Sequence, residues 1–433
     1  MSLIPETKKE AETRHFEMRR LELLADQLDQ EITAHEQGAL FREAFEWRFE
    51  FPEILDDQGQ FRGFDVVVGN PPYIPLEDFS EAERSIFKQT FKQVERKYES
   101  SVLFILRGLD LLKTDGSLAY IAPPTWFTGE NYTGLRKLLF EEKGIEKIIN
   151  LPFDVFPDAY VDTSVFIISN QPKEEYALYS FDKKSKAKEL EGLTFSYIKS
   201  SLVSAPAYKL VINPDAARIV QRLKSPSFIP LGEITISTQG LSGSAFPEVA
   251  ITDDNTFPFF ESNITINYAF SADSTRLVSL KQNASLKPFY GAAPKVLIRR
   301  IINRQDRLTV SYTEDKMVFK KDINPFIIKN GAYSVKYVLG ILASRLISYL
   351  YLNTSSIATK DDFRQTTLGE LRSLPIPAAT PAQQVEIAAL VEQVLVAKAA
   401  DATADTATLE QQIDALVAAL YGLTPAEQQL LTA

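Results

Sequence analysis

The residues whose types and spacing could do chemistry are Asn70, Pro71, Pro72 and Tyr73, which follow the apolar run Phe64–Val68. That run is rich in β-branched residues and predicts a strand buried on both faces of a parallel sheet. The prolines fix φ and lack an N–H, so the turn is stiff, and the Asn70 side chain and the Pro71 carbonyl can point outward. Open α/β sheets bind ligands at this carboxyl end of a strand.

Two oxygen acceptors on a stiff turn suit methyl transfer to a planar, conjugated amine. The lone pair of such a nitrogen is delocalised, so a catalyst must accept hydrogen bonds from both amine protons and draw the nitrogen towards a tetrahedral geometry. Asn70 Oδ1 and the Pro71 carbonyl oxygen are suitable acceptors. Tyr73 offers an aromatic face on which a base extruded from a duplex could stack. The alternative is an ordinary strand followed by a Pro-Pro turn.

The surrounding elements that must position this turn alternate between helix and strand. Apolar and turn residues predict a helix over 101–112 that stops at Gly116, a strand over 117–122, a helix over 134–142, and strands over 145–150 and 161–169. This alternation predicts a doubly wound α/β sheet. Upstream, residues 6–37 predict a charged helix with Leu21, Leu24, Leu28 and Ile32 on one face, and the alternating aromatics of 45–52 predict a half-buried strand.

The turn resembles the catalytic motif of amino methyltransferases that use S-adenosylmethionine and act on adenine in DNA, on release-factor glutamine or on ribosomal RNA. Residues 98–113, 116–126 and 154–165 resemble the later motifs of the gamma class of adenine-specific DNA methyltransferases. By this resemblance Phe156 would stack on the flipped adenine opposite Tyr73. From its residue type alone, without the resemblance, an ordinary core aromatic is the favoured interpretation of Phe156. The sequence departs from the family at Glu99, where Asp or Asn is usual.

A basic segment lies far downstream, although the net charge of the 433-residue chain is −10. Residues 281–307 hold seven basic side chains and one acidic side chain. Basic and aromatic residues together suit a DNA-contacting face, where cations neutralise phosphate and arginine forks read guanine. The candidates are Lys295, Arg299, Arg300, Arg304 and Tyr290. A solvated basic strand is the alternative.

Strand alternation separates the two neighbouring arginines of this segment. Arg299 shares a face with Lys295, whereas Arg300 shares the apolar face of Val296 and Ile298. We therefore expect Arg299 to contact DNA and Arg300 to make a buried ion pair or to end the strand.

A second resemblance, independent of the first, covers residues 294–300, 338–349 and 368–377. These segments are similar to the target-recognition domain shared by TaqI-like methyltransferases and type I specificity subunits. Together the two resemblances imply a site-specific DNA adenine N6-methyltransferase of a type IIG-like restriction-modification system, with double-stranded DNA as partner. The alternative is a DNA-binding specificity module whose methyltransferase half is a non-catalytic remnant.

The cofactor-binding motif of such an enzyme is not evident in the sequence. The resemblance implies S-adenosylmethionine and a glycine-rich turn upstream of Asn70, but the glycines there, at 38, 59, 63 and 69, form no Gly-x-Gly. We expect a fragment or split half with an incomplete pocket and unknown cofactor-binding residues, which a second chain carrying the upstream half could complete. No nuclease motif is evident either.

The predicted organisation has five parts. They are an N-terminal helical segment (1–60), the downstream half of a methyltransferase catalytic domain (61–175), a connector (176–230), a mostly β target-recognition domain (231–377) and C-terminal helices (378–433) that cap their own domain or serve assembly. The chain has no cysteine and only two histidines, which argues against disulfides and a metal site. With no signal peptide and no long apolar run, we expect a cytoplasmic protein.

Overall fold

The computed structural model describes residues 15–26, 28–29, 45 and 47–431, except for 95, 153–154, 157–160, 182–189, 206, 243–245, 251–252, 261–264, 272–275, 304 and 356–363. The chain divides into two compact units, Met1–Phe64 and Asp65–Ala433. Each unit is described by itself.

The first unit contains a helix and a short aromatic segment. Residues 15–26 and 28–29 are helical, within the helix predicted from the sequence, and Leu21, Leu24 and Leu28 are exposed. Ile32 lies outside the described residues. The strand predicted over 45–52 is wrong, because this segment forms the helical turns α2 (Trp47–Glu50) and η2 (Pro52–Ile54).

Ring contacts within the first unit explain that difference. The Trp47 ring stacks on Phe51 with centroids 5.7 Å apart, and both rings contact Phe64 edge-on. The aromatic residues therefore pack on one another rather than on the face of a sheet. The following turn is closed by Asp56, whose Oδ1 accepts the backbone N–H groups of Gln58 and Gln60.

The second unit begins with a six-stranded sheet of order β1-β2-β4-β3-β5-β6. Its strands are β1 (Phe64–Gly69), β2 (Leu112–Ala122), β3 (Gly144–Asn150), β4 (Ser164–Ser169), β5 (Glu175–Ser180) and β6 (Ser196–Lys199). β4 is antiparallel to both β2 and β3, whereas β3 and β5 are parallel. The α/β fold class predicted from the sequence is confirmed, as a mixed sheet.

Contacts at the two ends of β1 show its direction. Asp65, at its start, forms an ion pair of 2.7 Å with Lys113 at the start of β2. Tyr73, just beyond its end, reaches the carbonyl of Ile121 near the end of β2 at 3.0 Å. β1 and β2 therefore run in the same direction, and β1, β2, β3 and β5 all end at one edge of the sheet.

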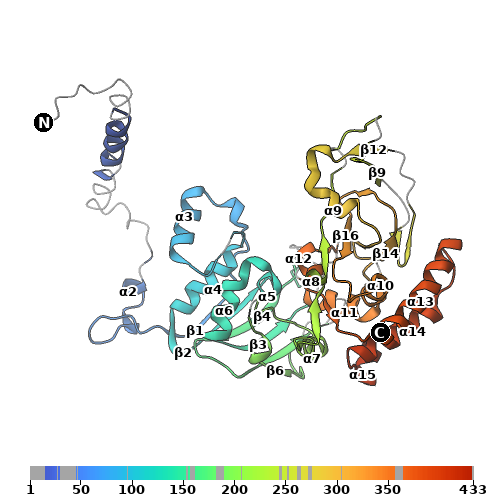
Figure 1. Ribbon diagram of the computed structural model, residues 1–433. Coiled ribbons are helices and arrows are strands. Elements are labelled where there is room, and N and C mark those ends of the chain that lie inside the picture. Colours follow the sequence, from blue (N-terminus) through green and yellow to red (C-terminus); the bar gives the residue numbers. More distant parts are fainter. Residues whose placement is uncertain are drawn as a thin grey trace. The chain divides into compact units, whose positions relative to one another are not determined.

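Helices α4 (Ser100–Asp110) and α6 (Thr133–Glu141) cover one face of this sheet (Figure 1). Their apolar residues share a core with Leu118, Tyr120 and Phe166 from the strands. α4 packs so closely on β2 that a Cβ on Gly108 would lie 2.2 Å from the Leu118 side chain. The core of the six-stranded sheet therefore lies on this face.

On the opposite face of the sheet, β1 is exposed, which corrects the expectation that Phe64–Val68 is buried on both faces. Val66 and Val68 point to this face and are 58% and 73% exposed. β1 is not buried on both faces, because it is the outermost strand of the described sheet and α4 and α6 cover only the side of Val67.

Two further boundaries differ from the sequence predictions. The predicted helix stop at Gly116 is wrong, because α4 ends at Asp110 and β2 already runs through Gly116. The segment 176–230 is more than a connector, since most of β5, all of β6 and helix α7 (Pro214–Arg222) lie within it. Short edge strands carry too few apolar residues to show an alternating pattern.

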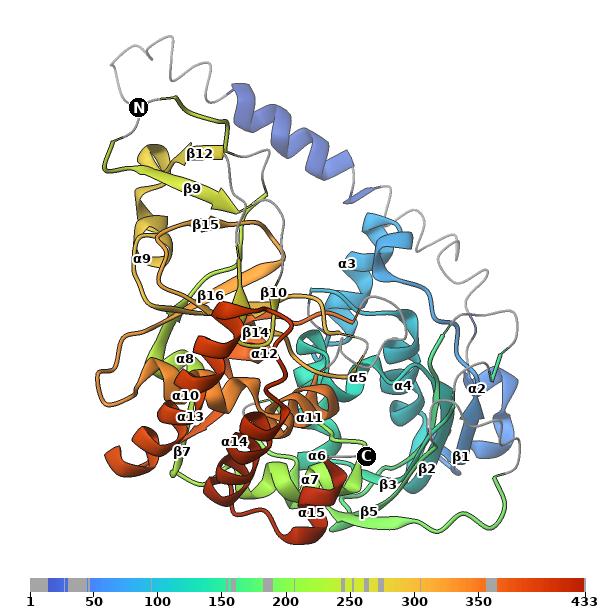
Figure 2. The same ribbon diagram turned by 90° about the vertical axis from the view of Figure 1, so that its right-hand side faces the viewer.

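The middle of the chain is rich in short strands around two long buried helices (Figure 2). β14-β13-β16-β8 form one sheet and β12-β9-β15 another. The strands are β7 (Phe228–Pro230), β8 (Thr235–Ser237), β9 (Thr256–Phe260), β10 (Thr265–Ile266), β11 (Ala269–Phe270), β12 (Arg276–Ser279), β13 (Lys295–Arg299), β14 (Val310–Thr313), β15 (Val318–Phe319), β16 (Ile323–Ile328) and β17 (Pro375–Pro377). The predicted mostly β body is thus present, with helices in its core.

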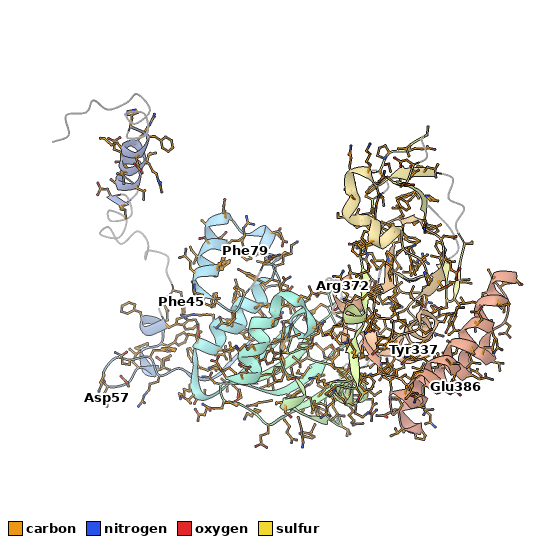
Figure 3. The ribbon with its side chains drawn as sticks, viewed as in Figure 1. Phe45, Asp57, Phe79, Tyr337, Arg372 and Glu386 are labelled. Carbon is orange, nitrogen blue, oxygen red and sulfur yellow. The ribbon has the colours of Figure 1, made fainter. Side chains whose placement is uncertain are left out.

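Helices α10 (Val335–Ala343) and α11 (Arg345–Thr354) form that core. Tyr337 of α10 is fully buried and donates its hydroxyl to the Pro377 carbonyl at 2.9 Å (Figure 3). In the described part of the chain no single helix could span a membrane; only α10 and α11 together, bent by 61°, have the length and composition for it.

Three helices end the chain: α13 (Pro381–Ala400), α14 (Ala407–Leu420) and α15 (Pro425–Leu430). Thr380 starts α13 with a capping box to Gln383. A Cβ on Gly340 of α10 would lie 2.7 Å from Ile387, so α13 packs tightly on α10. This packing is what the capping alternative predicted for the tail.

Candidate active site

The predicted catalytic turn lies at the edge where the parallel strands end. Asn70 follows β1, and the helical turn α5 (Thr125–Thr128) follows β2 after two prolines. The loop containing Phe156 follows β3. In open α/β sheets this edge binds the ligand, so the topology brings these segments to one place.

Within the turn, Tyr73 orients Asn70. The Tyr73 hydroxyl lies 2.6 Å from Asn70 Oδ1 and 3.0 Å from the Ile121 carbonyl oxygen, both of which accept from it. The Asn70 side chain is exposed, while Tyr73 is half-buried. A carboxamide oxygen has two lone pairs, so Asn70 Oδ1 can hold the tyrosine and still accept one amine proton.

Glu99 lies beside this turn. Its Oε1 accepts the Thr125 hydroxyl at 2.5 Å. Burial, and next the Glu99 carboxylate, raise the pKa of the Tyr73 phenol. The same two causes raise the pKa of Tyr132 to about 12. Both phenols therefore stay neutral hydrogen-bond donors at physiological pH, and the carboxylate at the family's departure point has a defined partner.

Phe156 is half-buried in the loop after β3, and several of its neighbours in the chain lie outside the described residues. Its ring makes no contact with another described aromatic ring, Tyr73 included. The two rings are thus placed at the same sheet edge but are not stacked on each other, and their joint role stays a prediction.

The structure contradicts two of the predicted DNA contacts. Lys295 is fully buried, and its Nζ donates to the Asp315 carbonyl at 2.6 Å above the Phe319 ring. Burial lowers the pKa of Lys295 to about 8. Tyr290 is also fully buried and donates to the Gln239 carbonyl. Lys295 lies on β13, between β14 and β16, whereas Tyr290 ends the helical turn α9 (Lys287–Tyr290). Both side chains are fully buried, so neither can reach DNA in this structure.

The two arginines at the end of β13 differ in their partners. Arg299 is half-buried, and its guanidinium has no partner among the described residues. Arg300 lies directly after the strand and donates to Gln365 Oε1 at 2.6 Å. The strand-end role expected for Arg300 agrees with this geometry. Arg304 lies outside the described residues.

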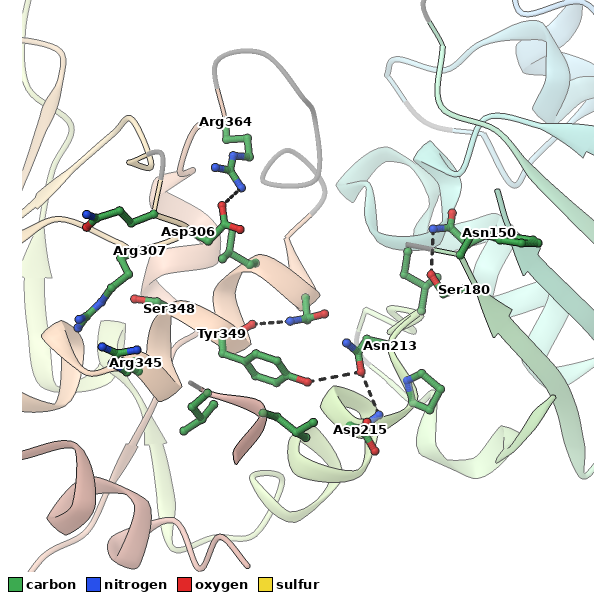
Figure 4. A pocket seen from close by; sticks show the side chains of 18 residues that line it. Asn150, Ser180, Asn213, Asp215, Asp306, Arg307, Arg345, Ser348, Tyr349 and Arg364 are labelled. Carbon is green, nitrogen blue, oxygen red and sulfur yellow. Dashed lines mark hydrogen bonds and ion pairs between the residues drawn. The ribbon is translucent and has the colours of Figure 1, made fainter. Parts of the chain in front are cut away.

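A separate polar pocket of about 640 Å³ lies where the catalytic sheet meets the specificity region (Figure 4). One wall includes Asn150 at the end of β3, and another includes three arginines. Each arginine has an acidic partner: Arg307 pairs with Glu410, Arg345 with Asp414 and Arg364 with Asp306. The sequence did not reveal this pocket because its walls come from widely separated segments.

A buried carboxylate joins the same two regions. Glu370 of α12 (Leu368–Arg372) accepts the hydroxyls of Tyr351 and Ser355 at 2.9 and 2.7 Å. Lys209, from the segment after the catalytic sheet, lies 3.3 Å from its Oε1. Only 6% of Glu370 is exposed. No sequence signal marked this residue, because its partners lie up to 161 positions away.

Comparison with known proteins identifies both regions. Residues 5–156 match the model of the Eco57I restriction-modification methylase, and residues 263–376 match that of the TaqI-like C-terminal specificity domain. The resemblances stated from the sequence are thereby confirmed as an Eco57I-like restriction-modification methylase region and a TaqI-like specificity domain, while the gamma-class adenine specificity stays a prediction.

Relatives and solved structures agree with these matches. The chain is 36% identical over 346 residues to a Methanocaldococcus jannaschii protein named as a type II restriction enzyme and methyltransferase, which covers 77% of this chain and 28% of that protein. It is 30% identical over 148 residues to the Escherichia coli type II restriction enzyme and methyltransferase RM.Eco57I, covering 33% of this chain and 15% of that one. The chain thus spans less than a third of these relatives.

The type IIL restriction-modification enzyme MmeI, solved in complex with DNA, aligns with 88% of this chain and 58% of its own at a TM-score of 0.54 and 12% identity, which shows a shared fold. The chain therefore combines an Eco57I-like restriction-modification methylase region with a TaqI-like specificity domain, and the relatives it resembles are type II restriction-modification methyltransferases.

Proposed function

We propose that this chain is the base-binding and sequence-reading portion of a DNA methyltransferase that modifies the N6 amine of adenine within a restriction-modification system. The observation that carries the proposal is the turn at the carboxyl edge of the sheet. There the exposed Asn70 carboxamide is oriented by Tyr73, and a specificity domain follows in the same chain. The relatives are methyltransferases of such systems, which supports DNA as the substrate.

In this proposal the turn acts on a base that has left the duplex. Tyr73 and Phe156 stack on the flipped adenine, which compensates part of the stacking lost from the helix. Asn70 Oδ1 and the Pro71 carbonyl oxygen each accept a hydrogen bond from one N–H of the amine. These two bonds draw the nitrogen lone pair out of conjugation, while Pro72 keeps the turn stiff. S-adenosylmethionine supplies the electrophilic methyl group when it is bound.

The residues of this chain fit the base better than the cofactor. The turn provides both amine acceptors, but no strand of the described sheet is followed by a glycine-rich turn, so we assign no residue here to S-adenosylmethionine. In the described sheet β1 has a neighbour on one side only, and Val66 and Val68 are exposed. We propose that a second polypeptide carrying the upstream half of the domain joins the sheet at β1.

Titration calorimetry with S-adenosylmethionine tests this division. We expect no tight binding by the isolated chain, and binding after addition of a protein encoded beside it. Tight binding by the isolated chain would refute the incomplete pocket. The exposed β1 also suits the second candidate function, a DNA-binding specificity module with a non-catalytic remnant, and that candidate predicts no cofactor binding in either experiment.

The specificity domain would read the DNA site, and we place the whole complex in the cytoplasm with the DNA. Half-buried Arg299 has no guanidinium partner among the described residues, so we propose that it contacts a phosphate or a base. Arg300 is held by Gln365, so we assign it to the fold.

Substitution of Asn70 tests the catalytic assignment in the complemented enzyme. Asn70→Ala removes one of two amine acceptors, and we expect the single-turnover methylation rate to fall about 10²- to 10³-fold while DNA affinity changes less than about twofold. Asn330→Ala, at another exposed asparagine, is the control and should change neither quantity. An equal loss of rate and affinity for Asn70→Ala would contradict the assignment.

A further inference from the structure

Ser100 holds the backbone on both sides of Tyr73. Its hydroxyl donates to the Pro72 carbonyl oxygen at 2.5 Å and accepts the Ile74 backbone N–H at 3.0 Å. The Ser100 N–H donates to the Ile74 carbonyl at 2.8 Å. The two bonds of the Ser100 hydroxyl therefore fix the two peptide units that flank the tyrosine, and the bond of its N–H fixes the next peptide unit.

Local structure explains why Ser100 can do this. It is the first residue of α4, where a backbone N–H has no partner inside the helix and is free to bond elsewhere. Just before it, the Leu76 N–H donates to the Tyr98 carbonyl at 3.0 Å, so segments 74–76 and 98–100 form a short antiparallel pair. The start of α4 is thus built against the turn, and Ser100 is only 3% exposed.

The tyrosine is then held at both ends. Ser100 fixes its backbone, while its hydroxyl is bonded to Asn70 and to the Ile121 carbonyl. The plane of the ring and the direction of the Asn70 carboxamide depend on these two anchors together. We propose that Ser100 is a positioning residue for methyl transfer, which sets the Tyr73 ring and, through it, the Asn70 acceptor; this rests on the function proposed above.

The next residue provides a matched control. Ser101 is also buried, at 0% exposure, but its hydroxyl has no hydrogen-bond partner in the described part of the chain. Ser100→Ala leaves the Pro72 carbonyl and the Ile74 N–H without their partner, whereas Ser101→Ala removes a hydroxyl that bonds nothing. The two variants delete the same atom from adjacent, equally buried positions.

Hydrogen exchange on the 433-residue chain tests the structural part without any activity. We expect the Ile74 amide to exchange about tenfold faster in Ser100→Ala and at the wild-type rate in Ser101→Ala, because a lost buried hydrogen bond opens this segment locally. Ser100→Thr keeps the hydroxyl and should retain slow exchange. Equal exchange in the two alanine variants would overturn the proposal.

Methylation by the complemented enzyme tests the functional part. Ser100→Ala should lower the single-turnover rate about tenfold at saturating DNA with unchanged DNA affinity, and Ser101→Ala should lower neither. Fast Ile74 exchange with a normal methylation rate would also overturn the positioning role. If the wild-type complex transfers no methyl group at all, the proposed function fails, and the exchange experiment still decides whether Ser100 holds the turn.

Discussion

Two segments of this chain carry polar side chains in or next to strands, and these side chains are exposed in one segment and buried in the other. Beyond β1, Asn70 remains exposed and its carboxamide is held by Tyr73. Along β13, Lys295 is withdrawn from solvent, and a backbone carbonyl and the Phe319 ring receive its ammonium group. The first segment lies past the end of its strand, whereas the second lies within a central strand.

Position in the sheet therefore matters more than residue type. A side chain in a turn past a strand end has no covering layer, so its polar atoms are available to a ligand. A side chain in a strand with neighbours on both sides must find partners inside the protein, even when it is a lysine. The three predictions that follow test this contrast.

Of these three predictions, loss of the Tyr73 ring should have the largest effect. Tyr73→Ala removes the stacking surface and the Asn70 anchor, and we expect the methylation rate of the complemented enzyme to fall about 100-fold, since base stacking alone contributes about 1–3 kcal/mol. Tyr73→Phe keeps the ring and loses only the hydroxyl bonds, so its rate should fall about tenfold or less. Equal rates for the two variants would show that the ring does not stack on the base.

Burial of Lys295 should make the free energy of unfolding depend on pH. Burial lowers the pKa of Lys295 to about 8 from the ordinary value of 10.5, so between these values the unfolded chain holds more protons and stability rises with pH. From about pH 8 to about pH 9.5 the free energy of unfolding should increase by roughly 1 kcal/mol more in the wild type than in Lys295→Met.

Urea unfolding at the two pH values measures this difference. Lys329→Met, at an exposed lysine, is the control and should keep the wild-type increase. If the free energy of unfolding of Lys295→Met rose with pH as much as that of the wild type, Lys295 would be solvated in the folded protein. The contrast between β1 and β13 would then fail.

The smallest effect is expected for the two arginines at the end of β13. Each lost phosphate contact removes about one unit from the slope of log affinity against log salt. Arg299→Ala should flatten this slope by about one unit in DNA binding at several salt concentrations, and Arg300→Ala should leave it unchanged because Gln365 already holds Arg300. The reverse order would reassign the two side chains.

Elements with strong local patterns could be predicted from the sequence. β3, β4 and α6 lie within a few residues of their expected bounds, because each has a clear apolar period. The aromatic segment 45–52 and the short strand β6 could not be predicted in this way, because ring packing and pairing with β5 decide their conformation.

In the candidate site, too, some features could be predicted from local sequence and others depend on long-range contacts. The position of Asn70 and Tyr73 at a strand end followed from contiguous residues. The roles of Ser100 and Glu99 required contacts across 25 or more positions, which no local pattern encodes. Charge counting failed at Lys295 because the number of cations in a segment says nothing about which strand of a sheet it forms.

The contact between Lys209 and Glu370 sets a limit on how such enzymes can exchange specificity. If relatives exchanged target-reading modules with a crossover between positions 209 and 351, Glu370 would keep its bonds from Tyr351 and Ser355 but would face the residue that the other parent carries at position 209. A chimaera joined upstream of Lys209 inherits both partners from one parent. Between parents that differ at position 209, hybrids with their junction before this lysine should therefore be more stable than hybrids with their junction just after it.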